Sequence, residues 1–447
     1  MKHWLNNLAK LQKKSKESKL VRNFRVKGEV GCFTIPLYGD LEGFGPQRSL
    51  QHYRTSGYRR VILHQGITKS SYRTVCSTFN HTVRQEKELG IKPSGVRYEA
   101  TVEAREIETA LSDKTAKILQ EYDFEPTGQP SNKAAVRQLN KVQKRHQTSP
   151  TKLKKAYEEI VAQANETIQP LLDFDQLRAD DYEQVKQTTY IGLDDVCNKR
   201  QKADRSSDTP APIDDTNNRK DGKKVYKKRK QLYHTVAKIF TPTQSYTLTA
   251  PKIGLLWATL IAFLLHNGCL RTLWIGLVDG QRSLHTFLLN RLKWRHCRLL
   301  LDWYHLRKKI HGQMYMGLQT NDRRDTVLLH VEQLLWYGLI NQAIEYINQI
   351  PKQQIKDKER LTILIGYFER NRELIPNYAL RKQLGLLLSS NRVEKENDFI
   401  VSARQKHNGM SWTRQGSDAL ALISANQRNK ELDNWLIKGE LNFKFAA

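Results

Sequence analysis

The middle of the chain carries short runs of apolar, aromatic and β-branched residues separated by polar turns, and this pattern predicts five β-strands. We expect the first three at residues 188–193, 231–240 and 245–250. The fourth, at 272–278, is almost continuously apolar, as expected of a strand that is covered on both faces. The fifth, at 297–301, follows a short predicted helix.

Helical periodicity lies between these strands and continues after them. Residues 253–265 are mostly apolar and predict a buried helix after Pro251, which suits a first helical turn; the run is too short to span a bilayer. A helical pattern covers 306–388, and a more mixed one covers 391–436. Three strands, a helix, a strand, a helix, a strand, an all-helical insertion and closing helices form the element order of an RNase H-like fold. We therefore predict an α/β chain of that kind.

The N-terminal half favours short helices with turn-like interruptions. Residues 66–75 are similar to a turn followed by the second helix of a helix-turn-helix, which Ser70 would cap. Val75 and Phe79 would lie on the inner face of that helix. A purely structural pair of helices explains the pattern equally well. In the DNA-binding interpretation, the outward residues available to DNA are Arg73, Thr74, Ser77 and Asn80.

The charge balance indicates what kind of partner the chain has. Lys and Arg total 74 against 46 Asp and Glu, which gives a formal net charge of +28. Such an excess on a folded chain favours a polyanion, and nucleic acid is the usual one because its phosphates reward many Lys and Arg contacts. A generally basic protein without such a partner is the alternative.

Cysteine usage and the N-terminus predict the compartment. The five cysteines lie far apart without a CxxC pair, which argues against a zinc ribbon or a disulfide framework and fits a reducing cytoplasm. The N-terminus is basic but lacks the apolar stretch of a secretion signal. We therefore expect a cytoplasmic protein without a membrane partner.

Three acidic residues stand where the predicted fold would need them for chemistry on phosphodiesters. Asp194 follows the first strand, Asp279 follows the fourth, and Glu394 lies in the first turn of the helix after the insertion. Three clustered carboxylates repel one another unless cations hold them, and two Mg²⁺ or Mn²⁺ ions supply that charge. Two such ions, about 3.5–4 Å apart, activate the attacking oxygen and stabilise the leaving oxygen of an in-line displacement.

Each acid also has an ordinary explanation. The Asp-Gly pair at 279–280 could be a turn after a strand, and Glu394 could be the glutamate of a capping box. Asp194 could cap the strand end while Asp195 faces the metal, or the reverse. We prefer Asp194 because it directly follows the apolar Leu193.

At these acids and the segments around them the chain resembles the DDE transposases of bacterial insertion sequences, most closely the ISLre/ISKra type, which are related to Mutator-like and hAT elements. The resemblance covers residues 190–435, whereas the N-terminal half of the chain is similar to the family only in general layout. The segments that carry it are 277–280 (LVDG), 301–305 (LDWYH), 391–395 (NRVEK), 404–406 (RQK) and 409–412 (GMSW).

The resemblance implies Asp194, Asp279 and Glu394 as metal ligands, and an all-helical insertion between His305 and Glu394. It also implies that His305 lies beside the active site, where it contacts the substrate phosphate or positions a neighbour of a metal ligand. A buried histidine that anchors the fifth strand is the alternative for His305. Asp302 competes for the role of second acid, but the family places that ligand on the fourth strand.

Basic residues follow the third acid closely. Arg404, Lys406 and Arg414 are candidates for phosphate contacts, although a solvated basic face explains them equally well. No GxxxxGK[ST] loop is present in the sequence, so ATP hydrolysis is not indicated.

The predicted function is that of a transposase that cleaves and joins DNA at the inverted-repeat ends of an insertion sequence. Its partners would be double-stranded terminal repeats and target DNA, and it would act as a homodimer or higher oligomer near a bacterial nucleoid. The alternatives are an inactive transposase-derived DNA-binding protein and an RNase H-like nuclease without strand joining. The predicted domains are a basic arm (1–48), a helical DNA-binding region (49–187), a first RNase H-like part (188–305), the insertion (306–388) and closing helices (389–447).

Overall fold

The computed structural model describes most of the chain. It covers residues 19–28, 31–39, 63, 70–82, 92–132, 147–201, 219–220, 223–224, 231–280, 282–295, 297–320, 322–406 and 410–445. The chain forms two compact units, each assembled from segments that are distant in sequence. The first unit contains Met1–Asp113, Cys197–His234 and Asp398–Phe443, and the second contains Lys114–Val196, Thr235–Asn397 and Lys444–Ala447. The boundaries of the five predicted domains do not coincide with this division.

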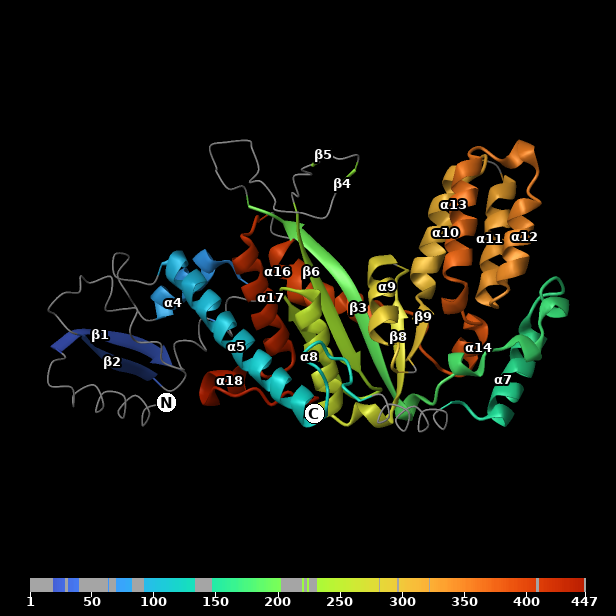
Figure 1. Cartoon of the computed structure of the whole chain (residues 1–447). Coiled ribbons are helices and arrows are strands. Elements are labelled where there is room, and N and C mark those ends of the chain that lie inside the picture. Colours follow the sequence, from blue (N-terminus) through green and yellow to red (C-terminus); the bar gives the residue numbers. More distant parts are fainter. Residues whose placement is uncertain are drawn as a thin grey trace. The chain divides into compact units, whose positions relative to one another are not determined.

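The second unit is built on a mixed five-stranded sheet with the order β7-β6-β3-β8-β9 (Figure 1). β6 and β7 are antiparallel, whereas β8 runs parallel to both β3 and β9. The chain is therefore an α/β protein, as the sequence predicts. The strand bounds are β3 (Thr188–Lys199), β6 (Gln231–Phe240), β7 (Ser245–Ala250), β8 (Leu273–Val278) and β9 (Cys297–Leu301).

Four strands begin and end within one residue of their predicted positions, because their apolar and β-branched runs are bounded by polar turns. The first strand is different, since β3 continues to Lys199 rather than ending before Asp194. Val196 and Asn198 are buried, so alternate residues keep facing inward although the sequence there is polar. The prediction that Asp194 ends the strand is therefore wrong: Asp194 lies inside it.

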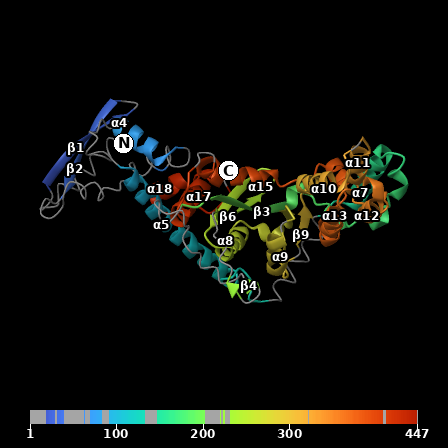
Figure 2. The same ribbon diagram turned by 90° about the horizontal axis from the view of Figure 1, so that it is seen from above.

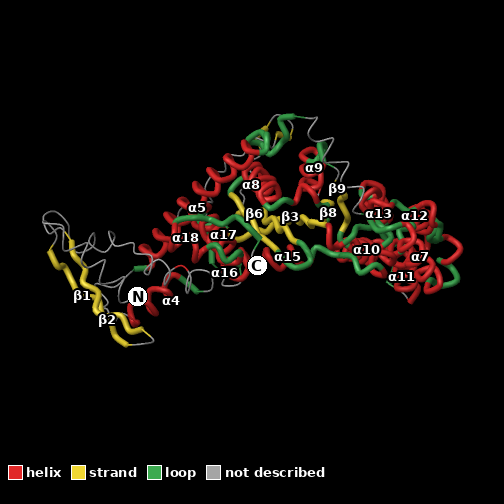
Figure 3. Tube along the Cα trace, turned by 90° about the horizontal axis from the view of Figure 1, so that it is seen from below, coloured by secondary structure: helices red, strands yellow, loops and turns green. Residues whose placement is uncertain are grey.

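Helices cover both faces of the sheet. α8 (Ile253–His266) and α9 (Arg282–Arg291) lie against one face and α15 (Asn391–Asn397) against the other (Figures 2 and 3). Every residue of α8 from Leu256 to Leu265 is buried, which confirms the predicted buried helix. In the part of the chain that the structure describes, no helix has the length and apolar character needed to cross a membrane.

The segment between β9 and α15 is helical, as predicted (Figure 1). α10 packs along α13, and α11 packs against α12. Asp302, Asp357 and Asn377 begin α10, α13 and α14, because their side chains accept hydrogen bonds from backbone N–H groups of the first turn. The helices are α10 (Trp303–Gly317), α11 (Asp322–Trp336), α12 (Ile340–Asn348), α13 (Lys358–Arg370) and α14 (Tyr378–Gln383).

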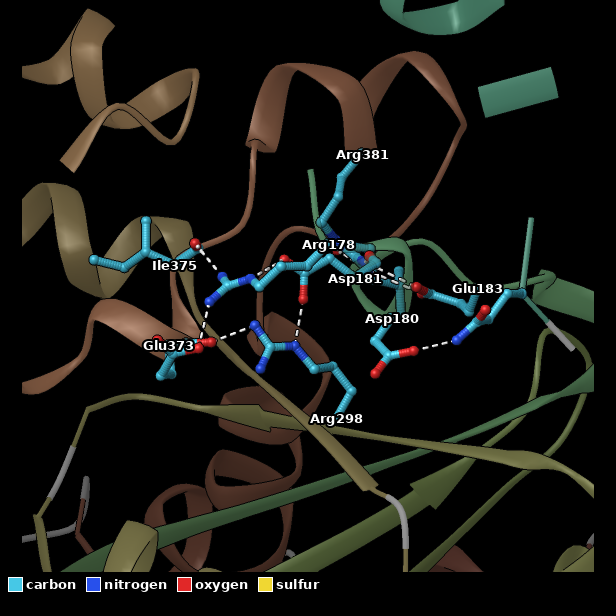
Figure 4. Close-up of polar contacts among 10 residues, drawn as sticks. Arg178, Asp180, Asp181, Glu183, Arg298, Glu373, Ile375 and Arg381 are labelled. Atoms are coloured by element: carbon cyan, nitrogen blue, oxygen red, sulfur yellow. Dashed lines mark hydrogen bonds and ion pairs between the residues drawn. The ribbon is translucent and has the colours of Figure 1, made fainter. Parts of the chain in front are cut away.

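A buried ionic network connects this helical insertion to the sheet (Figure 4). Arg381 of α14 donates from both terminal nitrogens to Glu183, at 2.7 and 2.8 Å, and both side chains are almost fully buried. Glu183 also accepts a hydrogen bond from the hydroxyl of Tyr190 on β3, at 3.0 Å. Arg298 of β9 pairs with Asp181 in the same network. The network therefore joins the segment before β3, the edge strand β9 and the insertion.

The first unit contains an N-terminal hairpin and several helices. β1 (Lys19–Gly28) and β2 (Gly31–Gly39) pair antiparallel, so the predicted basic arm contains a β-hairpin that the sequence analysis did not expect. β1 contains two Val and one Phe, and β2 contains Phe, Thr, Ile and Tyr, all residues that strands favour. Among the residues that the structure describes, the α-helices that lie wholly in this unit are α4 (Tyr72–Thr82), α16 (Ala403–Gln405), α17 (Arg414–Arg428) and α18 (Leu432–Lys438).

α4 is the helix that the sequence predicts as the second of a helix-turn-helix. It begins one residue later than expected, because the hydroxyl of Ser71 rather than Ser70 accepts the hydrogen bond from Thr74 N, at 3.0 Å. Val75 is buried, as predicted. The first helix of the predicted pair falls almost wholly outside the described residues, so the motif as a whole stays a prediction.

Candidate active site

The strand register brings the first two predicted acids together. β3 and β8 are parallel, and Gly192 is paired with Leu277. Asp194 lies two residues after Gly192, and Asp279 lies two residues after Leu277. Both aspartates therefore lie on the same side of the sheet as that pair. Adjacent parallel strands therefore carry the two aspartates side by side.

The third acid approaches the same place because α15 packs very closely on β3. A Cβ atom at Gly192 would lie only 2.1 Å from Cγ2 of Val393, so no residue with a side chain fits there without displacing the helix. Glu394 follows Val393 in the first turn of α15. The glycine of the first strand thus sets the distance between the helix and the strand that carries Asp194.

The electrostatics of Asp194 show that the three acids influence one another. Burial is the main cause that raises the pKa of Asp194 to about 6, and the carboxylates of Asp279 and Glu394 raise it further. His305 and the backbone N–H of Asp195 act in the opposite direction. Asp194, Asp279 and Glu394 therefore form one interacting group, which we call the acid cluster.

Asp194 and its neighbour Asp195 make different contacts. Oδ1 of Asp194 accepts from the backbone N of Asp195 at 2.8 Å, and Oδ2 accepts from Nδ2 of Asn397 at 2.6 Å. Asp195 instead accepts from the hydroxyl of Thr235 on β6, at 2.6 Å. The placement of the two side chains agrees with the choice of Asp194 over Asp195.

His305 lies between Asp302 and the acid cluster. Its Nε2 is 3.4 Å from Oε1 of Glu394, and its Nδ1 is 3.4 Å from Oδ1 of Asp302. The Asp302 carboxylate is the main cause that raises the pKa of His305, and Glu394 and Asp279 add to the effect. The structure therefore places His305 beside the cluster, as the resemblance implies, and the side chain is only half-buried.

Asp302 has a capping position rather than a free one. It is fully buried, it begins α10 by accepting from the backbone N of His305 at 2.9 Å, and it accepts from the hydroxyl of Ser390 at 2.8 Å. Burial alone would raise its pKa, but the hydrogen bonds from His305 and Ser390 hold the pKa of Asp302 below its ordinary value. These contacts explain why Asp279, not Asp302, stands with Asp194.

Two further residues of the site escaped the sequence analysis. Asn397 contacts Asp194, and it could have been noticed because it lies one helical turn after Glu394. Tyr367 of α13 packs its hydroxyl against Gly280, and burial together with the nearby Asp279 raises the pKa of this tyrosine. Nothing in the sequence connects Tyr367 to Asp279, because only the packing of the insertion brings them together.

The acid cluster has the donor atoms that Mg²⁺ or Mn²⁺ prefers. All of its groups are oxygen donors, and Oε1 of Glu394 and Oδ1 of Asn397 are buried without a hydrogen-bond partner. Within the described ranges, however, no three His, Cys, Asp or Glu side chains are close enough to hold a metal ion together. The residues fit a divalent cation by donor chemistry and charge, although the described side chains stand further apart than a bound ion requires.

The predicted DNA-contacting residues all lie in the first unit and differ in exposure. Arg73 and Thr74 of α4 are exposed, Asn80 is half-buried, and Lys406 is exposed. Arg414 is exposed and pairs with Asp418, with Nε 3.1 Å from Oδ2.

Arg404 is different, because its side chain is only 1% exposed. Its guanidinium lies over the rings of Tyr72 and Trp412, with the carbon 5.6 and 5.1 Å from their centroids. This burial argues against Arg404 as a phosphate contact and corrects that prediction.

Comparisons of the chain with protein-family models, with curated proteins and with solved structures find no match.

Proposed function

We propose that the chain is a DDE-type transposase, which cleaves and joins DNA at the ends of an insertion sequence by metal-dependent phosphodiester chemistry. The observation that carries the proposal is the acid cluster: Asp194, Asp279 and Glu394, far apart in sequence, interact electrostatically at one place. A buried carboxylate whose pKa is raised by neighbouring carboxylates is typical of functional sites, because a fold gains nothing from such repulsion.

The arrangement of the elements supports the proposal. Numbered along the chain, the sheet order β7-β6-β3-β8-β9 is 3-2-1-4-5, which is the order of RNase H-like domains. The first three strands precede the apolar α8, and the fourth and fifth are parallel to the first or to each other. The helical insertion lies between the fifth strand and the helix of the third acid, where the resemblance expects it.

In this proposal the acid cluster holds two Mg²⁺ or Mn²⁺ ions, which when bound activate an attacking oxygen and stabilise a leaving oxygen. The chain's own residues prepare the site for them. Asp194 is held by hydrogen bonds to both oxygens, and Glu394 is placed by the packing of α15 on Gly192. The pKa of His305 is raised, and this side chain can donate a hydrogen bond to a phosphate oxygen at the edge of the acid cluster.

The proposed substrate is double-stranded DNA. The net charge of +28 supports a polyanionic partner, and the exposed Arg73, Thr74 and Lys406 are proposed to contact phosphates. After hydrolytic nicking at an inverted-repeat end, the freed 3′-hydroxyl would attack target DNA, and one phosphodiester would be exchanged for another. Since two ends must be joined, we propose that a homodimer or a higher oligomer acts on them in the bacterial cytoplasm.

The test is an in vitro reaction on supercoiled plasmid that carries the coding sequence with its flanking DNA, incubated with the full chain and Mg²⁺ or Mn²⁺. Joined products are expected. Nicks without joining would instead support a nuclease, and a gel shift without cleavage would support a DNA-binding protein.

Asp194→Asn and Asp279→Asn are each expected to lower cleavage at least about 100-fold, since each removes a charge that the reaction requires. Asp195→Asn is the matched control, because its side chain faces Thr235 instead of the acid cluster. Cleavage that survives Asp279→Asn unchanged would overturn the assignment.

A further inference from the structure

Asn397 is the last residue of α15 and is only 6% exposed. Its Nδ2 donates a hydrogen bond to Oδ2 of Asp194 over 2.6 Å. Asn397 and Glu394 stand three residues apart on one helix and therefore share a face. One turn of α15 thus carries both Glu394 and the Asn397 amide that donates a hydrogen bond to Asp194.

The position of α15 does not depend on this amide alone. Glu396, its neighbour, is 1% exposed, pairs with Lys238 of β6 and accepts from the hydroxyl of Thr247 on β7, at 3.2 Å. Val393 packs on Gly192. These contacts already fix the helix on the sheet, so the contact from Asn397 to Asp194 has a different consequence: it orients one carboxylate.

The second observation concerns Oδ1, the other polar atom of the Asn397 amide. Oδ1 of Asn397 is buried and accepts no hydrogen bond from any residue that the structure describes. A buried acceptor without a donor is unfavourable, because the desolvation of that atom is not compensated, so proteins rarely keep one without a function. Both polar atoms are attached to one carbon, so Oδ1 lies beside the carboxylate that Nδ2 contacts.

The carboxylate of Asp194 has room for a further partner. Each of its oxygens accepts one hydrogen bond, from Asp195 N and from Asn397 Nδ2. Because each carboxylate oxygen offers about two acceptor sites, one on each oxygen remains for a cation. Asn397 fixes which way these remaining sites point.

We propose that Asn397 is a positioning residue for the divalent cations of the acid cluster. Its Nδ2 fixes the rotation of the Asp194 carboxylate, and its Oδ1 accepts a hydrogen bond from water in the shell of a bound cation. This inference rests on the proposed function, since it requires the acid cluster to hold metal. Groups that orient metal ligands typically affect metal affinity about 10- to 100-fold when they are removed.

The experiment measures Mn²⁺ binding by the full chain without DNA, by electron paramagnetic resonance of the free ion, and does not depend on turnover. Asn397→Ala is expected to weaken Mn²⁺ affinity by about 10- to 100-fold. Thr247→Val is the matched control: it removes a buried hydrogen bond to the same helix, through Glu396, without touching Asp194. Its Mn²⁺ affinity is expected to stay within a factor of about 3 of the unsubstituted chain.

A second variant keeps the inference testable if Asn397→Ala does not fold. Asn397→Asp retains an acceptor but replaces the donor by a carboxylate that faces Asp194. Its thermal unfolding midpoint without metal is expected to fall, because like charges repel, and Mn²⁺ is expected to raise that midpoint more than it does for the unsubstituted chain. Equal Mn²⁺ shifts in the two proteins would overturn the inference.

Asp194→Asn separates this inference from the proposed function. If Asp194→Asn loses Mn²⁺ binding while Asn397→Ala retains it, the positioning role is wrong and the metal site stands. If Thr247→Val weakens binding as much as Asn397→Ala, Asn397 only holds the helix, and the inference again fails. Mn²⁺ binding that is undetectable in the unsubstituted chain, or unchanged in Asp194→Asn, contradicts both proposals.

Discussion

Neighbouring residues of one strand acquire different chemical surroundings because successive side chains point to opposite faces. Asp194 meets Asn397 and the acid cluster, whereas Asp195 meets Thr235. The sequence left these two aspartates as alternatives, since the choice depends on the face that the strand presents to α15. A single contact across the sheet therefore decides which acid belongs to the candidate site.

Burial has a comparable effect on a histidine in the first unit. His234 of β6 is 3% exposed; its Nε2 is 2.7 Å from Oγ of Ser417, and its Nδ1 is 3.3 Å from Oδ1 of Asp418. Burial, followed by the positive charge of Arg414, lowers the pKa of His234 to about 4. A neutral imidazole fits this buried environment, because it carries no charge and its ring nitrogens can still take part in hydrogen bonds.

This lowered pKa predicts a loss of stability in mild acid. In the unfolded chain His234 takes up a proton near pH 6.5, whereas in the folded chain it does so only near pH 4. The contribution of His234 to the free energy of unfolding is therefore complete above pH 6.5 and is lost as the pH falls towards 4. At pH 5 the loss is about 2 kcal/mol relative to pH 8. His234→Gln is expected to lose correspondingly less free energy of unfolding between pH 8 and pH 5, measured by urea denaturation.

The comparison with His234→Gln is necessary because Asp418 works in the opposite direction. Burial is the main cause that raises the pKa of Asp418 to about 6, so its ionisation disfavours the folded chain as the pH rises from about 4 to about 6. Both proteins retain this aspartate, and their difference therefore reports on His234. Equal losses of stability in the two proteins would show that the histidine keeps an ordinary pKa.

At the scale of elements, the close packing of α15 on β3 is the feature that assembles the candidate site. Gly192→Ala would place a methyl group 2.1 Å from Val393, so the helix must move. We expect a loss of about 1–3 kcal/mol in the free energy of unfolding, which is typical of overpacking, and weaker Mn²⁺ binding because Glu394 moves with the helix.

The double variant Gly192→Ala/Val393→Ala tests whether the clash itself is responsible. Shortening Val393 makes room for the new methyl group, so the double variant is expected to recover Mn²⁺ binding relative to Gly192→Ala. Gly254→Ala in α8 is the control, because a Cβ there meets nothing within 4 Å and alanine favours a helix. If the double variant binds no better than Gly192→Ala, the packing of Val393 does not set the position of Glu394.

The elements themselves were largely readable from the sequence. Apolar and β-branched runs such as 231–240 and 297–301 have sharp polar borders, and their strands begin and end where these borders predict. The sequence analysis missed the continuation of β3 beyond Asp194, because residues 194–199 are mostly polar, although Val196 and Asn198 among them are buried. The sequence analysis also missed β1, in which Lys and Arg residues separate the apolar residues that are typical of a strand.

Contacts between distant segments were the part that the sequence could not supply. Asp194, Asp279 and Glu394 could be proposed as one site because the predicted strand order places the two aspartates on adjacent strands. In the structure the three acids form an interacting group. Tyr367 beside Gly280 depends on how the insertion packs, and no local pattern records that. The sequence thus predicted the acids and missed the groups that surround them.

At the scale of the whole chain, the Arg381–Glu183 pair is the contact that most clearly joins distant segments (Figure 4). Both side chains are almost fully buried, so removing one leaves the other charge in the interior without its partner. Arg381→Met is expected to lower the free energy of unfolding by about 3–5 kcal/mol, measured by urea denaturation.

Two further variants separate the buried charge from lost packing. Adding Glu183→Gln to Arg381→Met removes the unpaired charge and should recover part of the loss, since the amide can still accept from the hydroxyl of Tyr190. Arg360→Met is the control in the same insertion: Arg360 and Asp357 form an exposed pair at 3.5 Å, so the expected change is within about 1 kcal/mol. A double variant as unstable as Arg381→Met would show that Arg381 stabilises this network by packing and by its hydrogen bonds to the backbone carbonyl of Leu387, not by neutralising Glu183.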